Sequence, residues 1–303
     1  MTLPRRTVEF LDATLRQQCA DAAPVARVAA LLGELAQGRP VTDAALAELL
    51  APIARDLARD PCLQLAWWFS CEPADFRALH ALNACRLAMF LALADGKDAG
   101  QAAAEGACGL FYDIGLWLAP AREAVLSGAA LDDAGHAAVQ SHCVAGEALL
   151  RRLFPDELAA RVALEHHERA DGTGYPASRP RSQLHDLSLR MQIVDSLLGQ
   201  IEPRPWRPRR NPVDAMGRLA MQGQRGLFDG PQLRQVLLLL GLYPVGSLVR
   251  LSSGEVALVT GVNAADLKRP GVRLLTDDTG EPRQKQVELR LADYPALHVA
   301  DGI

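Results

Sequence analysis

The chain has 303 residues, 49% of them hydrophobic and 22% charged, and a formal net charge of -4. That length can bury a sizeable core in one large domain with an appendage or in two ordinary domains, and the charge gives no electrostatic reason to expect nucleic acid as a partner. The most apolar run begins at Val236 and is shorter than the roughly 20 residues that cross a membrane, and the first residues lack the apolar core of a signal peptide, so we expect a cytoplasmic protein with no membrane partner.

Residues 1–60 are predicted to form an N-terminal helical segment. Apolar residues recur three and four positions apart in the stretches that begin at Val25 and Ala44, which is the pattern of amphipathic helices. Thr42 or Asp43 is a suitable N-cap for the second stretch.

Residues 61–242 are predicted to form a mainly α-helical domain. Helical periodicity returns in six stretches, at 75–94, 98–117, 132–153, 156–168, 186–200 and 212–221. Two loops rich in Pro, Gly and Arg, at 171–182 and 203–212, interrupt them. The apolar run from Val236 is interpreted either as the last core helix or as the seam of a homodimer.

Residues 243–303 are predicted to form a small C-terminal β unit. Apolar residues alternate in period two on both sides of a Ser-Gly turn at 253–254, and a second strand, turn and strand pattern starts at Gly271. Alternation around turn residues is typical of β-hairpins.

The six cysteines show no spacing typical of metal ligands. Most of them lie in apolar helical stretches, so we expect small buried hydrophobic residues in a reducing cytoplasm. They are Cys19, Cys62, Cys71, Cys85, Cys108 and Cys143.

The stretch HHERADGTGYP, residues 166–176, carries the residue types of a metal site. Histidine is a common ligand for transition metals, but neighbouring residues of a helix diverge by about 100°. His166 and His167 therefore need partners from other helices if they bind one metal. The helical region supplies four candidates, His80, Asp113, His142 and Asp195.

The order and spacing of these residues resemble those of the HD-GYP domain, a metal-dependent subgroup of the HD phosphohydrolase superfamily. The resemblance runs from about Leu63 to Met221 and fills eight specified positions of the eleven-residue motif at 166–176. It implies an HD-type helical bundle, divalent Fe or Mn, and hydrolysis of cyclic di-GMP to pGpG or GMP.

The resemblance also implies a role for each residue. His80 and Asp195 hold one metal, and Asp113 is the catalytic carboxylate that bridges to a second. His142, His166 and His167 hold that second metal, and Glu168 orients an imidazole.

Two further groups follow from the same resemblance. Arg204 and Arg207, nine and twelve residues after Asp195, bind substrate phosphate, for which guanidinium groups are well suited. The loop at the rim of the site is implied to contact GGDEF diguanylate cyclases. Its residues are Asp171, Gly172, Gly174, Tyr175 and Pro176.

Three positions depart from the HD-GYP pattern. Tyr112 stands where the pattern has the histidine of its His-Asp dipeptide, and Leu116 stands where it has a lysine. Phe76 stands where members with three metals carry a glutamate, so one or two metals per chain are expected. Loss of one cation near the phosphate typically slows an enzyme about 100- to 1000-fold, and loss of the histidine weakens the first metal site. Tyr112 is interpreted as a packing residue in place of a ligand.

Three functional hypotheses remain open at this point. The first is a slow cyclic di-GMP phosphodiesterase. The second is a degenerate module that binds metal or the nucleotide as a sensor or interaction partner without turnover. The third is hydrolysis of another phosphate ester, since a fold alone does not determine a substrate. The histidines that match no motif position are interpreted as structural, namely His136, His185 and His298.

Overall fold

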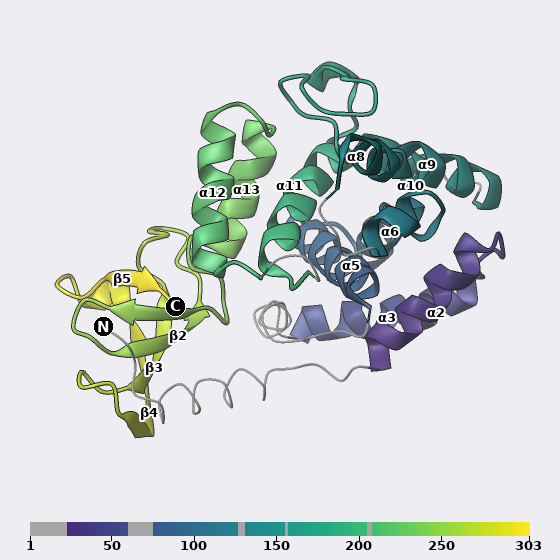
Figure 1. The fold of residues 1–303 in the computed structure, drawn as a ribbon. Coiled ribbons are helices and arrows are strands. Elements are labelled where there is room, and N and C mark those ends of the chain that lie inside the picture. Colours follow the sequence, from purple (N-terminus) through teal and green to yellow (C-terminus); the bar gives the residue numbers. More distant parts are fainter. Residues whose placement is uncertain (1–22, 60–74, 127–130, 155–156, 205–207) are drawn as a thin grey trace.

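A computed structural model describes residues 23–59, 75–126, 131–154, 157–204 and 208–303 of the chain. Helices make up the described chain as far as Leu240, and an antiparallel sheet follows (Figure 1). The predicted fold class, a mainly helical bundle with N-terminal helices and a small C-terminal β unit, is confirmed. Residues 1–22 of the predicted N-terminal segment lie outside the described residues, as do Arg207 and the cysteines at 19, 62 and 71.

Two N-terminal helices, α2 (Ala23–Ala36) and α3 (Asp43–Arg59), pack on the bundle. The hydroxyl of Thr42 accepts a hydrogen bond from the backbone N–H of Ala45 at 3.2 Å. Of the two predicted candidates, Thr42 and Asp43, Thr42 is therefore the N-cap of α3. Buried apolar residues such as Leu32 and Leu57 face α5 and α6. Burial of these side chains holds both helices in place.

Helix α5 (Phe76–Ala94) is the central helix of the bundle. It begins after Asp75, whose carboxylate accepts hydrogen bonds from the N–H groups of Arg77 and Ala78. Almost all of its residues are buried, as expected for a helix that is apolar all round. Among the described residues, α5 is the helix long and apolar enough to cross a membrane, and 83% of that apolar window is buried inside the fold.

Three of the predicted helices differ from those in the structure. The stretch 98–117 divides into α6 (Ala99–Phe111) and the short 3-10 helix η2 (Ile114–Trp117), and 132–153 divides into α8 (Asp133–Gln140) and α9 (His142–Leu153). Helix α10 (Glu157–Glu165) ends three residues earlier than predicted. Apolar residues continue at helical spacing across the breaks within 98–117 and 132–153, so the pattern alone does not reveal those two breaks.

The remaining helices complete the bundle. They are α7 (Ala121–Leu126), which the sequence analysis missed, η3 (Arg181–Gln183), α11 (Asp186–Ile201), α12 (Pro212–Gln224) and α13 (Gly230–Leu240). The apolar run from Val236 lies in α13, where Val236 and Leu240 are buried against α5, α11 and α12. It is therefore a core helix, and the homodimer stays a prediction.

The C-terminal sheet has the strand order β4-β3-β2-β1-β5, with antiparallel pairing throughout. Its strands are β1 (Leu248–Leu251), β2 (Val256–Gly261), β3 (Gly271–Thr276), β4 (Pro282–Arg290) and β5 (Val299–Gly302), with η4 (Leu291–Asp293) after β4. The two predicted hairpins are β1–β2 and β3–β4. Strand β5 was not predicted, and it returns the chain to β1 and to the neighbourhood of α12.

Candidate metal centre

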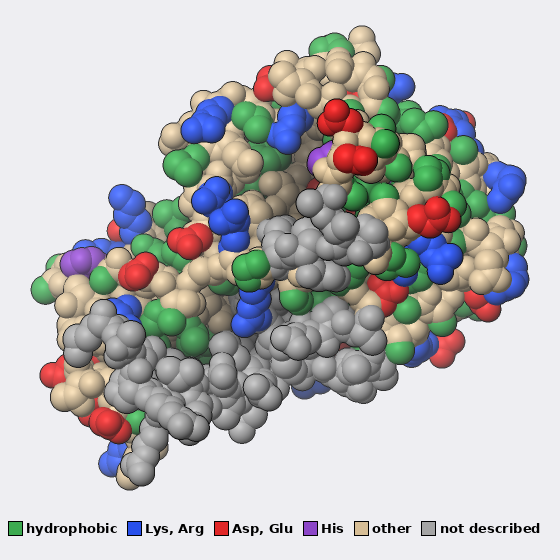
Figure 2. Space-filling model, viewed as in Figure 1, with side chains coloured by type: hydrophobic (Ala, Val, Ile, Leu, Met, Phe, Trp, Pro, Cys, Tyr) green, Lys and Arg blue, Asp and Glu red, His purple; other side chains and the backbone are tan. Residues whose placement is uncertain are grey.

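Six predicted ligands from five segments meet at one place in the bundle. His80 comes from α5 and Asp195 from α11, while Asp113 lies between α6 and η2. His142 is the first residue of α9, and the pair His166 and His167 follows the end of α10. Figure 2 shows a histidine recessed in a hollow of the surface. The side chains form two groups that share Asp113: one with His142, His166 and His167, the other with His80 and Asp195.

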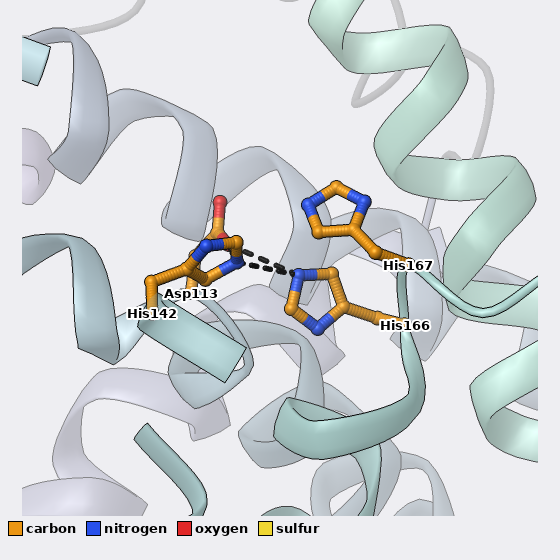
Figure 3. A group of neighbouring side chains, drawn as sticks. All are labelled: Asp113, His142, His166 and His167. Carbon is orange, nitrogen blue, oxygen red and sulfur yellow. Dashed lines mark hydrogen bonds and ion pairs between the residues drawn. The ribbon is translucent and has the colours of Figure 1, made fainter. Parts of the chain in front are cut away.

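The first group of side chains converges on one oxygen of Asp113. Its Oδ1 lies 3.2 Å from Nε2 of His142 and 3.2 Å from Nε2 of His166, and these two nitrogens lie 3.1 Å from each other (Figure 3). His167 joins this group. Each of the four residues offers one ligand atom, and these four atoms all lie within 4.8 Å of one another.

Backbone carbonyls hold the orientation of both imidazoles. Nδ1 of His142 donates to the carbonyl of Val139 at 2.6 Å, and Nδ1 of His166 donates to the carbonyl of Ala163 at 2.9 Å. Rings held in this way direct their Nε2 atoms to the buried Oδ1 of Asp113. Three acceptor atoms this close together need a proton or a metal cation between them.

The separations of these atoms match the edges of a metal coordination shell. Ligand atoms about 2.1 Å from a metal lie roughly 3.0 Å apart in an octahedron and roughly 3.4 Å apart in a tetrahedron. The three measured separations, 3.1, 3.2 and 3.2 Å, fall within that interval. Imidazole nitrogens with one carboxylate oxygen suit borderline transition metals, so this group fits such a metal.

The same contacts perturb the acid-base behaviour of the group. Burial disfavours the charged form of Asp113, but the hydrogen bonds and charges of His142 and His166 outweigh it and hold the pKa of the carboxyl well below its usual range. For His142, burial lowers the pKa, and the bond to Asp113 reverses the effect and raises the pKa well above normal. The site therefore favours a positive charge beside Asp113, either a proton or a metal.

The prediction that His166 and His167 diverge on a helix was wrong. Helix α10 ends at Glu165, and both histidines lie in the turn that follows, with ring centroids 4.2 Å apart. A turn does not impose the 100° step of a helix, so two adjacent side chains can reach one centre. Figure 3 shows the rings of His166 and His167 next to each other, opposite Asp113 and His142.

The second group contains an additional hydroxyl. Nε2 of His80 lies 3.1 Å from Oδ1 of Asp195 and 3.5 Å from Oδ2 of Asp113, as expected for a second set of ligands. The hydroxyl of Tyr112 lies 2.5 Å from the same nitrogen of His80 and 3.2 Å from Oδ1 of Asp195. The phenol therefore contacts the same nitrogen that a metal at His80 requires.

Tyr112 is fully buried and neutral in these surroundings. Burial first, and then the nearby carboxylates of Asp195, Asp113 and Glu202, raise the pKa of the phenol well above its ordinary value of 10. A neutral phenol donates a hydrogen bond but is a poor metal ligand. The group of His80 and Asp195 thus fits a metal less well than the group of three histidines does.

Glu202 belongs to the site although the sequence analysis missed it. Its buried carboxylate accepts from Nδ1 of His80 at 2.6 Å and from the amide of Asn83 at 2.8 Å. A carboxylate on the outer nitrogen of a histidine fixes the orientation and tautomer of the ring. The sequence spacing gave one indication of this contact. Asn83 is one helical turn after His80, and Glu202 is two turns after Asp195, so each lies on the same helix face as a predicted ligand.

Arg204 lies beside His80 and is partly occupied by internal contacts. Its Nη2 lies 3.5 Å from Oε2 of Glu202 and 3.1 Å from Nδ1 of His80, and its guanidinium stands 5.1 Å from the centroid of the Phe76 ring. The side chain is 10% exposed. Arg204 is therefore near the predicted ligands, and its phosphate role stays a prediction together with that of Arg207.

Glu168 is engaged by the backbone of the following loop, and its predicted role on an imidazole stays a prediction. Its two carboxylate oxygens accept from the backbone N–H groups of Ala177 and Arg179, at 2.8 and 2.9 Å. Because α10 has already ended, the side chain points to the returning loop and holds that loop closed. Gly174 is required there, because a Cβ at this position would lie 2.4 Å from the backbone of Glu168.

The other loop residues line the approach to His167. Tyr175 stacks on the His167 ring with centroids 4.7 Å apart, and its N–H donates to the carbonyl of His167. Asp171 accepts from Thr173, Gly172 has a φ of +77°, and Pro176 is exposed. These contacts shape a wall of the site.

Leu116 and the unmatched histidines make structural contacts. The carbonyl of Leu116 accepts from Arg77 at 3.3 Å. His185 caps α11 by accepting from the N–H of Leu187, and Nδ1 of the exposed His136 donates to the carbonyl of Asp132. His298 donates its backbone N–H to Ser252.

Comparison with known proteins identifies relatives of this chain. A family model described as HD domain matches residues 77–231. The cyclic di-GMP phosphodiesterase PA4108 of Pseudomonas aeruginosa is 28% identical over 253 residues, which are 82% of this chain and 60% of that protein. The 3'3'-cGAMP-specific phosphodiesterase 3 of Vibrio cholerae is 35% identical over 77 residues, 25% of this chain and 17% of that protein. The chain thus spans less than two thirds of either relative.

A solved structure shares the fold. It is Bd1817, a HDG"Y"P protein from Bdellovibrio bacteriovorus, which superposes with a TM-score of 0.54 over 71% of this chain and 68% of that one. The sequence identity is 14%, so the likeness concerns the fold.

Proposed function

The chain belongs to the HD domain family, and we propose that it is a cytoplasmic, metal-dependent phosphodiesterase that hydrolyses cyclic di-GMP to pGpG or GMP. One observation carries the proposal: Nε2 of His142, Nε2 of His166 and Oδ1 of Asp113 face one another at 3.1 to 3.2 Å, the separations of ligand atoms around one metal. The substrate rests on similarity to PA4108, a cyclic di-GMP phosphodiesterase by name.

The residues that would hold the metal are Asp113, His142, His166 and His167, and Fe or Mn is the metal we propose. When bound, such a metal supplies a Lewis acid for a phosphoryl oxygen and lowers the pKa of water. Backbone carbonyls hold the rings of His142 and His166 with Nε2 toward Asp113. Asp113 presents Oδ1 to these rings and Oδ2 to His80, so one carboxylate orients both groups of side chains.

A second candidate function is favoured by Tyr112. Because its hydroxyl contacts Nε2 of His80, the group of His80 and Asp195 suits a metal less well than the other group of the described residues, which has three histidines. A protein with one metal, and cyclic di-GMP bound beside it, can act as a sensor or as an interaction module without turnover. GGDEF diguanylate cyclases are the partners we propose for that case.

Metal analysis and turnover distinguish the two candidates. The protein is purified without added metal, its metal content per chain is counted, and cyclic di-GMP is followed under Fe(II) and under Mn(II). Formation of pGpG that disappears in Asp113→Asn supports the enzyme. Metal with unchanged nucleotide supports the module, and no bound metal contradicts both.

The matched control is Asp278→Asn, which makes the same chemical change at an exposed position of the β unit. It is expected to keep the metal content and turnover of the original chain. If it loses them as Asp113→Asn does, the effect of the latter is not specific to the centre.

A further inference from the structure

A cavity of about 490 Å³ lies between α11 and α12, separate from the metal centre. Ser196 and Gln200 of α11 line it on one side. Successive residues of a helix are rotated by about 100°, so these two side chains leave α11 in directions different from that of Asp195. The cavity therefore belongs to another face of the same helix.

Three arginines border this cavity and none of them is neutralised internally. Arg218 and Arg225 come from α12 and its end, and Arg210 comes from the loop before α12. Within the described chain, none of their guanidinium groups takes part in an ion pair or a side-chain hydrogen bond. Figure 2 shows Lys and Arg side chains spaced along the surface that α12 occupies in Figure 1.

A second polar cavity of the molecule shows the opposite arrangement. That cavity of about 430 Å³ is lined by Lys97, Arg161 and Arg190, among others. Each of these cations has a carboxylate partner: Glu105 for Lys97, Glu165 for Arg161 at 2.9 Å, and Asp95 for Arg190 at 2.6 Å. The cations of that second cavity form ion pairs within the fold, whereas the guanidinium groups of Arg210, Arg218 and Arg225 are available to a ligand.

The lining residues define the chemistry of that ligand. Among the described residues that line the cavity none is acidic, and three guanidinium forks match the geometry of phosphate oxygens. Gln222 also lines it, and its Oε1 is buried without a hydrogen-bond partner in the described chain. An unpartnered acceptor needs a donor, which a ribose hydroxyl or a base amino group supplies.

We propose that this cavity binds a nucleotide, with its phosphates on Arg210, Arg218 and Arg225 and its nucleoside near Gln222. A volume of about 490 Å³ suits a small molecule of that size. The site is independent of the proposed hydrolysis, because it shares no residue with the metal centre.

The test uses the full chain without added metal, with EDTA, at about 0.15 M NaCl, where weak surface attraction is screened. ATP and pyrophosphate are titrated by calorimetry into the original protein and into the Arg218→Gln/Arg225→Gln double variant. We expect the double variant to bind ATP about 10- to 100-fold more weakly, since charge-assisted hydrogen bonds are lost. Gln222→Met should weaken the binding of ATP and leave that of pyrophosphate unchanged.

The matched control is the double variant Arg234→Gln/Arg290→Gln, which removes the same charge from exposed positions outside the cavity. It should bind ATP as the original protein does. No binding of ATP at millimolar concentration, or an equal loss in the control, overturns the proposal. Equal affinity for ATP and pyrophosphate overturns its nucleoside part. Thermal unfolding of every variant verifies the fold, and metal content should be unchanged in all of them.

Discussion

The carboxylate of Glu202 lies 2.6 Å from Nδ1 of His80, and both side chains are buried at 1% and 2% exposure. The other carboxylate oxygen accepts from Asn83, so the end of α11 is joined to two successive turns of α5. This contact determines how the His80 ring is turned and directs its Nε2 toward Asp195 and Tyr112.

Replacing Glu202 with Ala should lower the free energy of unfolding by about 1–3 kcal/mol, because it leaves His80 and Asn83 buried without their acceptor. Urea unfolding of the metal-free protein measures the change. Glu281→Ala, at an exposed position of the β unit, is the control and should change stability by less than about 0.5 kcal/mol. Equal effects of the two substitutions would show that the buried contact contributes nothing.

Tyr112→His combined with Leu116→Lys should raise both the metal content and the turnover of cyclic di-GMP. The change removes the hydroxyl that occupies Nε2 of His80 and supplies an imidazole and a cation in its place. Metal analysis and nucleotide chromatography measure the outcome. Tyr112→Phe removes the hydroxyl without adding a ligand and should show no such gain. If the double variant also shows none, the loss extends beyond these two positions.

Gly115→Ala should destabilise the protein and weaken metal binding. A Cβ on Gly115 would lie 2.0 Å from the carbonyl oxygen of His142, so the start of α9 must shift, and overpacking of this kind costs about 1–3 kcal/mol. Chemical unfolding and metal titration measure both effects. Gly33→Ala is the control, because a Cβ there meets nothing within 4 Å. It lies within α2 and should stabilise by up to about 1 kcal/mol.

Cys85 should resist alkylation in the folded protein. Burial, partly offset by the charge of Arg86, raises the pKa of its thiol to about 12, and the thiolate is the reactive form. Iodoacetamide at about pH 8.5 should leave Cys85 unmodified until denaturant is added, as measured by peptide mass spectrometry. Rapid modification of the native protein would contradict the buried position of this residue.

Most of the helices and both hairpins were predictable from residue patterns. Asp75 marks the start of α5, and alternation around two turns marks the strands. The break after Phe111 was not predictable, since apolar residues continue through it, and no residue pattern marked the end of α10 at Glu165. Strand β5 has four residues and carries too short a pattern to be recognised.

The residue order of HHERADGTGYP and its distant partners was enough to predict an HD-type bundle and the two sets of side chains that the structure brings together. Tertiary packing determined how the side chains of the two sets are oriented. Whether His166 and His167 face one centre depends on where α10 ends, and whether His80 is open to a metal depends on Tyr112 and on Glu202, 122 residues away. Side-chain directions at a helix end follow from backbone angles that distant contacts set, and a local pattern holds no information about those contacts.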